Sequence, residues 1–234
     1  MQDMLKIIQE RHSVRMPFDP ERPIARQDLR KILEAGRWAP SAHNMQNFEI
    51  IIVDDKKILE EIGNIKSTIS DTFIQENYQQ LSFSEEELLR KKVGLLGTMF
   101  PPSWRTPGVK PVVEEGRSRP FPVCPTLLIV LYDSGKRAPA SEGDFLGIIS
   151  LGCMMENLWL MANSLGINFQ IISALASGSV EKEVKRILTV PEHLKIAFTV
   201  RLGYLAVAPP SYLRVRRDIE DFSHHNHFGN RGFE

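Results

Sequence analysis

One long apolar segment, residues 142–165, constrains the fold of this 234-residue chain more than any other feature. It is apolar nearly all round and ends at Gly166, a residue type that commonly follows a helix. It also contains Asp144 and Glu156, and each acid at the centre of a bilayer costs roughly 2.5–3.5 kcal/mol. The segment is therefore predicted to be a buried helix in a protein core and not a membrane span. Because so short a chain has little structure with which to cover such a helix, a dimer that buries one flank of the helix is expected.

Composition excludes several classes of protein. Hydrophobic residues make up 42% of the chain and charged residues 25%, which excludes disorder over most of the length. The 29 basic and 29 acidic residues give zero formal net charge, so no basic excess favours a nucleic-acid partner. Cys124 and Cys153 are too few and too far apart for a disulfide framework, which favours a reducing, cytoplasmic compartment. Residues 1–15 lack the apolar core of a signal peptide.

Hydrophobic periodicity predicts an alternation of helices and strands. Residues 125–132 form a continuous apolar run that is expected to be a strand buried on both faces. The resulting order of elements predicts one α+β domain over residues 1–234, with a lid-like insertion at about 64–122 and a C-terminal extension at about 209–234. Helices are predicted at 3–11, 26–38, 55–63, 84–93, 142–165 and 179–188, and strands at 48–53, 125–132, 167–172 and 195–203.

Two polar clusters in the first fifth of the chain could bind a ligand. Arg11 and Arg15 flank Ser13 where the first helix gives way to a loop, and their planar guanidinium groups can converge on a phosphate or carboxylate. Alternatively, they are solvated arginines favoured by the helix dipole. Residues 38–48 carry amide side chains that suit a planar ring with imide and carbonyl groups, although, taken alone, they are better explained by a simple polar turn.

A third cluster lies near the C-terminus, within residues 212–232. Arg214, Arg216 and Arg217 could close on the same anion as the first cluster. The histidines that follow, His224, His225 and His227, could be interpreted as a metal-binding or regulatory module. Adjacent side chains diverge, however, and no established ligand spacing supports them, so no metal site is predicted. The sequence also lacks the GxGxxG, GxxxxGK[ST] and GxSxG motifs of dinucleotide, phosphoryl-transfer and serine-hydrolase sites.

Four segments, in this order, resemble motifs of the nitroreductase family of flavin enzymes. They are RHSVRMPF, ILEAGRWAPSAHNMQNF, NLWLMANSLGINF and RVRRDIEDFSHHNHFG. The resemblance implies a nitroreductase-like fold, with a central mixed or antiparallel sheet flanked by helices and a long buried central helix. It also implies an intertwined homodimer with two FMN molecules in the interface. The residues that it assigns to cofactor binding are Arg11, His12, Ser13, Arg15, Pro40, Ser41, Ala42, Asn44, Ile172, Ser173, Ala174, Arg214 and Arg216.

The resemblance also implies which part of the cofactor each of these residues would contact. Arg11, Ser13, Arg214 and Arg216 would hold the FMN phosphate, and Arg15 would lie by the N1 and O2 edge of the flavin. The residues Pro40, Ser41, Ala42 and Asn44 would reach the flavin of the partner subunit. The strand end Ile172–Ala174 would lie against the ring, with a backbone N–H of Ser173 or Ala174 near N5. Arg117 or Arg119 would add charge near the pyrimidine.

The activity implied by the resemblance is hydride transfer from NAD(P)H through flavin N5 to an electron-poor acceptor such as a nitroaromatic or a quinone. One shared site would give ping-pong kinetics with no essential side-chain nucleophile. Reductive dehalogenation and flavin fragmentation, which other family members carry out, remain alternatives in which residues 97–122 form a lid. The chain departs from the family pattern at Asn47-Phe48, where Pro-Trp is usual, and at Ser173-Ala174, where Glu-Gly or Gly-Gly is common.

Overall fold

The computed structural model describes residues 3–66, 84–91, 124–139, 143, 145–207 and 214–231. The chain forms two compact units, Met1–Ser67 with Arg119–Ala208, and Thr68–Ser118 with Pro209–Glu234. The proposed lid at 97–122, including Arg117 and Arg119, lies outside the described residues. The arrangement as one domain with a lid therefore stays a prediction.

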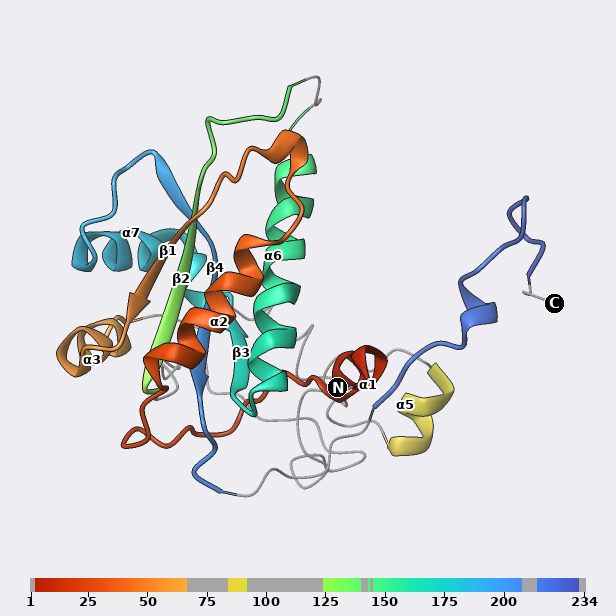
Figure 1. Ribbon diagram of the computed structural model, residues 1–234, viewed down its shortest axis with the longest axis horizontal. Coiled ribbons are helices and arrows are strands. Elements are labelled where there is room, and N and C mark those ends of the chain that lie inside the picture. Colours follow the sequence, from red (N-terminus) through yellow and green to blue (C-terminus); the bar gives the residue numbers. More distant parts are fainter. Residues whose placement is uncertain are drawn as a thin grey trace. The chain divides into compact units, whose positions relative to one another are not determined.

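A four-stranded antiparallel sheet forms the centre of the first unit (Figure 1). Its strands are β1 (Glu49–Val53), β2 (Thr126–Asp133), β3 (Asn168–Ile172) and β4 (Leu194–Gly203), in the order β1-β2-β4-β3. Because β4 pairs with both β2 and β3, the chain crosses from β2 to β3 through the long helix α6 (Phe145–Ser164). This arrangement leaves β3 at one edge of the sheet, and the candidate functional site lies along that edge.

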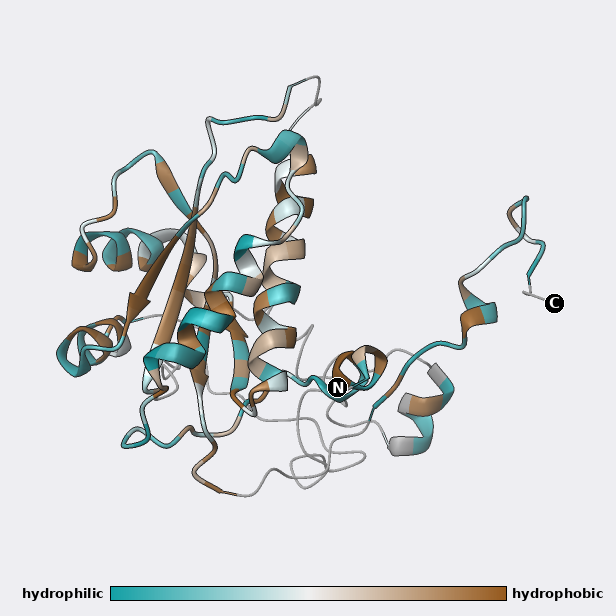
Figure 2. Ribbon diagram, viewed as in Figure 1, coloured by the Kyte–Doolittle hydropathy of each residue, from teal (hydrophilic) through white to brown (hydrophobic). Residues whose placement is uncertain are grey.

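Helices cover both faces of the sheet, as Figure 1 shows. On one face α6 packs with α2 (Arg26–Arg37), and on the other lie α3 (Lys56–Gly63) and α7 (Gly178–Ile187). Each face carries a hydrophobic core: the first core lies between the sheet and α2 and α6, and the second lies between the sheet and α3 and α7. Successive side chains of β2 point to opposite faces, so Leu128 belongs to the first core and Leu127 to the second. The first six residues of β2 are buried, which confirms that this strand is covered on both faces. In Figure 2 β2 is accordingly coloured as hydrophobic.

Each predicted helix and strand is confirmed, with bounds that differ by at most three residues. Among the described residues, the other helices are α1 (Met4–Glu10) and α5 (Glu85–Lys91). A capping box begins α5, since the N–H of Glu87 donates to Ser84 Oγ at 3.2 Å and the N–H of Ser84 donates to Glu87 Oε2 at 2.8 Å. The described ranges also contain 3-10 turns that were not predicted, namely η1 (Ala42–Asn44), η4 (Ala174–Ala176) and η5 (Ile219–Asp221).

The long helix α6 is buried over only part of its length. By length and composition it could cross a membrane, with a mean hydropathy of 1.5 over 18 residues, but its C-terminal turns pack in the first core. Its first turns are exposed among the described residues, so the predicted burial of that flank depends on the expected dimer. Its buried side chains are Leu151, Met154, Leu158, Trp159 and Ala162, and its exposed apolar side chains are Phe145, Leu146, Ile148 and Ile149. These four exposed residues are called the α6 flank below.

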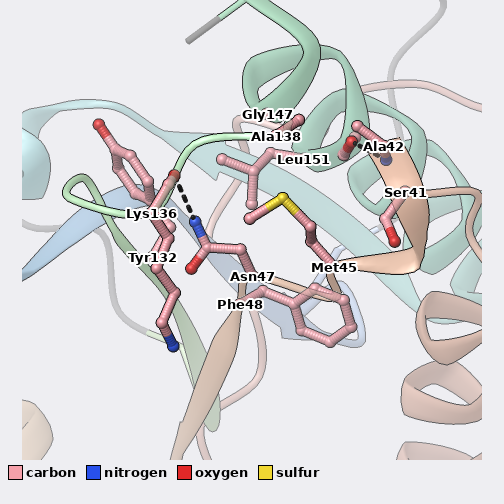
Figure 3. A pocket seen from close by; sticks show the side chains of 11 residues that line it. Ser41, Ala42, Met45, Asn47, Phe48, Tyr132, Lys136, Ala138, Gly147 and Leu151 are labelled. Atoms are coloured by element: carbon pink, nitrogen blue, oxygen red, sulfur yellow. Dashed lines mark hydrogen bonds between the residues drawn. The ribbon is translucent and has the colours of Figure 1, made fainter. Parts of the chain in front are cut away.

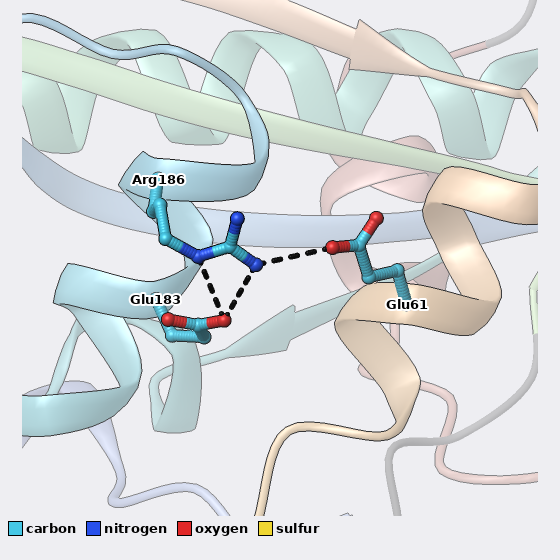
Figure 4. A network of polar contacts seen from close by, with 3 residues as sticks. All are labelled: Glu61, Glu183 and Arg186. Atoms are coloured by element: carbon cyan, nitrogen blue, oxygen red, sulfur yellow. Dashed lines mark hydrogen bonds and ion pairs between the residues drawn. The ribbon is translucent and has the colours of Figure 1, made fainter.

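A charged network joins the two helices on the second face (Figure 4). Arg186 on α7 donates from Nε and Nη2 to Glu183 Oε1, and from Nη2 to Glu61 Oε1 of α3 at 3.2 Å. The hydrogen bond from Arg186 lowers the pKa of Glu183. All three side chains are exposed, so water and salt screen their attraction and the network contributes little to stability.

Replacing Asp55 with alanine is expected to destabilise the fold by about 1 kcal/mol. Asp55 Oδ1 accepts hydrogen bonds from the N–H groups of Lys57 and Ile58 at 2.9 and 3.0 Å and so caps the N-terminus of α3. Urea denaturation measures the loss. The matched control is Asp54→Ala, which removes the same charge one residue earlier without removing the cap. Equal losses in the two variants would contradict the assignment of the cap.

Candidate functional site

The N-terminal polar cluster lies along the edge strand β3. Ser13 forms a parallel bridge with Phe169, and the N–H of Val14 donates to Phe169 O at 3.0 Å. The strand ends at Ile172, three residues beyond Phe169, and runs into the η4 turn. The structure thus brings Ser13 and the predicted ring-contacting residues Ile172–Ala174 to the same edge of the sheet, although they are about 160 residues apart in the chain.

The two arginines of this cluster are half-buried and differ in their contacts. Arg11, at the C-terminus of α1, donates from Nε to Glu156 Oε1 at 2.6 Å and stacks 4.6 Å from the centre of the Trp159 ring. Within the part of the chain that the structure describes, its Nη1 and Nη2 donate no hydrogen bond, so these nitrogens remain available to an anion. Arg15 donates from Nη1 to Ser13 O at 2.9 Å. His12 is also half-buried in this segment.

A buried cation that sequence analysis missed, Arg201 of β4, lies beneath the same segment. It is 0% exposed, donates from Nη2 to the carbonyl oxygens of Met16 and Val14, and donates from Nε to Gln170 Oε1. Its guanidinium lies 4.1 Å from the centre of the Phe18 ring. The sequence could have indicated this residue, because Arg201 is a single arginine at a core-facing position in an otherwise apolar part of the strand.

Burial and two neighbouring groups determine the pKa of Arg201. Burial lowers the pKa of Arg201 to about 10; the nearby Cys124 opposes this shift, and the charge of Arg15 adds to it. Burial also raises the pKa of the Cys124 thiol to about 12, so the thiol is neutral near pH 7. Arg201 remains protonated near pH 7, because that pH is well below its lowered pKa. Two positive charges therefore act together at this edge of the sheet, and they favour an anionic ligand.

The second polar cluster forms the η1 turn and the loop that leads into β1. The N–H of Ala42 donates to Ser150 Oγ on α6 at 3.0 Å. Asn47, which stands where the family usually has proline, donates from Nδ2 to Asp133 O at 2.9 Å and accepts from the N–H of Asp133 at 3.1 Å. These paired bonds tie the loop to the end of β2. Asn47 thus holds the loop through side-chain hydrogen bonds that a proline at this position could not form.

This loop is strained and partly exposed. His43, Asn44 and Gln46 have φ of 51°, 52° and 47°, in the left-handed region that costs non-glycine residues of order 1–3 kcal/mol. Their side chains are exposed, whereas Ser41 and Ala42 are half-buried, and Pro40 is exposed. Strain of this kind persists only where surrounding contacts hold the backbone, as the Ala42 and Asn47 hydrogen bonds do here.

A pocket of about 380 Å³, counted with its open mouth, lies between this loop, the end of β2 and α6 (Figure 3). In Figure 3 the side chains of Met45, Phe48 and Leu151 surround it, and Ser150 and Gly147 of α6 complete the wall. The same turns of α6 carry the exposed α6 flank. Residues predicted to contact a cofactor across a dimer interface therefore lie beside an uncovered apolar surface.

The third polar cluster belongs to the second unit. Arg214 and Arg216 are exposed, and Arg216 donates from Nη1 to Val215 O at 2.7 Å. Because the two arginines lie in a different unit from Arg11, their convergence on one phosphate stays a prediction. The ring of His224 packs at 4.4 Å on that of Phe228, and across the described ranges no three His, Cys, Asp or Glu side chains form a candidate metal site.

Comparison with known proteins shows which family this chain is similar to. A family model described as the nitroreductase family matches residues 8–204. A protein of Archaeoglobus fulgidus named as an NADH dehydrogenase/NAD(P)H nitroreductase is 40% identical over 63 residues, which are 27% of this chain and 35% of that protein. A Staphylococcus aureus protein named NADPH-dependent oxidoreductase is 22% identical over 95% of this chain and 72% of its own length. The crystal structure of a nitroreductase with bound FMN from Bacteroides fragilis superposes with a TM-score of 0.57, at 26% identity, covering 92% of this chain and 96% of that one.

Proposed function

Because this chain belongs to the nitroreductase family, we propose that it is an FMN-dependent oxidoreductase. It takes reducing equivalents from NAD(P)H and passes them to a small electron-poor acceptor such as a nitroaromatic or a quinone. The FMN-bound Bacteroides fragilis structure supports the cofactor, and the names of the Archaeoglobus fulgidus and Staphylococcus aureus relatives support the electron donor. The observation that carries the proposal is geometric: Ser13 and Arg15 lie along the β3 edge, and the buried Arg201 donates to the carbonyl oxygens on either side of Arg15.

The residues at this edge fit FMN by their chemistry. Guanidinium groups suit both a phosphate and the carbonyl-bearing edge of a flavin, and Ser13 adds a hydroxyl between Arg11 and Arg15. When bound, FMN supplies the hydride-accepting and hydride-donating centre at N5. Arg11 and Ser13 would bind the phosphate, Arg15 would lie by the N1 and O2 edge, and Ile172–Ala174 would form the surface against the ring. These side chains bind and orient the reactants, and none is a nucleophile.

The active form is proposed to be a homodimer. The α6 flank is the surface that a second copy covers, because a monomer would leave four large apolar side chains in water. Pro40, Ser41, Ala42 and Asn44 lie beside that flank and complete the FMN site of the partner subunit. The pocket in Figure 3 then borders the interface instead of facing open solvent. A cytoplasmic location is part of the same proposal.

A visible spectrum of the purified full-length protein tests the proposal most directly. We expect a yellow protein whose absorbance near about 450 nm bleaches when NADH or NADPH is added anaerobically. With a nitroarene or a quinone as acceptor, double-reciprocal plots at several NAD(P)H concentrations should be parallel, as in a ping-pong reaction. A folded protein that binds no FMN on titration would refute the cofactor, and intersecting plots would refute the shared site.

A further inference from the structure

We propose that Arg201 is a positioning residue for Arg15, and that its buried charge increases the preference of the site for reduced over oxidised FMN. The inference rests on the proposed function, because it assigns Arg201 a role toward FMN. Its contact with segment 14–16 does not depend on the cofactor and can be tested separately.

The hydrogen bonds of Arg201 bracket Arg15 in the chain. Nη2 donates to Met16 O on one side of Arg15 and lies 3.5 Å from Val14 O on the other. On the opposite side of the guanidinium, Nε donates to Gln170 Oε1, which fixes the plane of the group against β3. The backbone that carries Arg15 is therefore held from beneath by a rigid, fully buried group.

The ring of Phe18 adds a second constraint. It lies against the guanidinium at 4.1 Å from the ring centre and is itself buried, at 1% exposure. An arginine can donate to several carbonyl oxygens while it stacks on an aromatic ring, because its donors lie in one plane. A lysine in the same place has a single ammonium nitrogen and cannot reproduce that set of contacts. The geometry thus calls for arginine specifically, beyond its charge.

The positive charge of Arg201 adds to the positive charge of Arg15 at the candidate site. Burial lowers the pKa of Arg201, and the charge of Arg15 lowers it further, as expected for two neighbouring like charges. An anionic group beside Arg15 relieves that repulsion, and a buried charge is screened far less than an exposed one. Reduced flavin carries more negative charge at the N1 and O2 edge than oxidised flavin does. Arg201 therefore stabilises the reduced form more than the oxidised form.

Three variants separate this role from a general contribution to stability. Arg201→Met removes the charge and the hydrogen bonds while keeping a long side chain, and Arg201→Lys keeps the charge but loses the planar set of donors. Val200→Ala is the matched structural control, because Val200 is 0% exposed and packs on the opposite face of the same strand. Each variant is measured in two ways. Amide hydrogen exchange of residues 12–18 is followed in the apoprotein, and the dissociation constants of oxidised and reduced FMN are compared.

We expect Arg201→Met to lose protection in residues 12–18 and to lower the preference for reduced FMN about tenfold, or about 30 mV for a two-electron couple. Arg201→Lys should lose part of the protection but keep the preference within about twofold. Val200→Ala should change neither beyond its overall loss of stability. Unchanged protection in both Arg201 variants would overturn the positioning role. An unchanged preference in Arg201→Met, or an equal change in Val200→Ala, would overturn the electrostatic role.

The Lys variant keeps the test decisive if the Met variant does not fold. Full protection of residues 12–18 in Arg201→Lys would then overturn the positioning role. A tenfold loss of the FMN preference in Arg201→Lys would overturn the electrostatic role, because the charge is still present. A wild-type protein that binds no FMN refutes the proposed function and the electrostatic role with it. The exchange measurement on the apoprotein still tests the positioning role in that case.

Discussion

Replacing Arg15 with glutamine is expected to weaken the binding of reduced FMN about 100-fold, with a much smaller effect on oxidised FMN. The substitution removes a half-buried guanidinium whose Nη1 is held against Ser13 O, and whose charge is reinforced by Arg201. Removing one fixed donor aimed at developing charge costs enzymes about 100- to 1000-fold in rate. We expect kcat/KM with NAD(P)H to fall by a similar factor.

The control for Arg15→Gln is Arg186→Gln. Arg186 belongs to the exposed network between α3 and α7, so this variant makes the same change in net charge on the surface of the molecule (Figure 4). Fluorescence titration with oxidised and reduced FMN and anaerobic stopped-flow reduction measure the two effects. Reduced-FMN affinity in Arg15→Gln within about threefold of the wild-type value would contradict the assignment of Arg15.

Local sequence pattern was sufficient to predict the elements that carry the site. The continuous apolar run of β2 indicated a strand covered on both faces, and each face received its own pair of helices. Gly166 indicated the end of α6, where it takes a φ of 69° that glycine tolerates at little cost. Such features depend on residues near one another in the chain.

The contacts that organise the site could not be predicted in the same way. Arg201 reaches Met16 across 185 residues, and Arg11 reaches Glu156 across 145, so no local period reports either contact. Apolar content likewise predicted that α6 needs cover but did not show that its first turns are left exposed by the described part of the chain. The resemblance placed Ser13 and Ile172–Ala174 in one site, and the structure brings them to one edge of the sheet. The role of each residue stays a proposal.

Replacing Ile148 with aspartate is expected to convert the protein from a dimer to a folded monomer. Ile148 is 61% exposed at the centre of the α6 flank, so the substitution leaves the protomer core intact. In a dimer, however, it would bury an unpaired carboxylate against apolar side chains, at a cost of several kcal/mol. Analytical ultracentrifugation measures the change in mass, and far-ultraviolet circular dichroism confirms that the helices persist.

The same variant should lose FMN affinity by at least about 100-fold, because a monomer lacks the partner's Ser41, Ala42 and Asn44. Leu89→Asp is the control, since Leu89 is also a large apolar side chain exposed on a helix, at 51%, but lies on α5. An Ile148→Asp protein that remains dimeric would place the interface elsewhere. A monomer that binds FMN as tightly as the wild-type protein would show that one protomer forms the site alone. Loss of the dimer together with FMN is expected only if the exposed turns of α6 and the η1 loop form one interface, as their contact through Ala42 and Ser150 suggests.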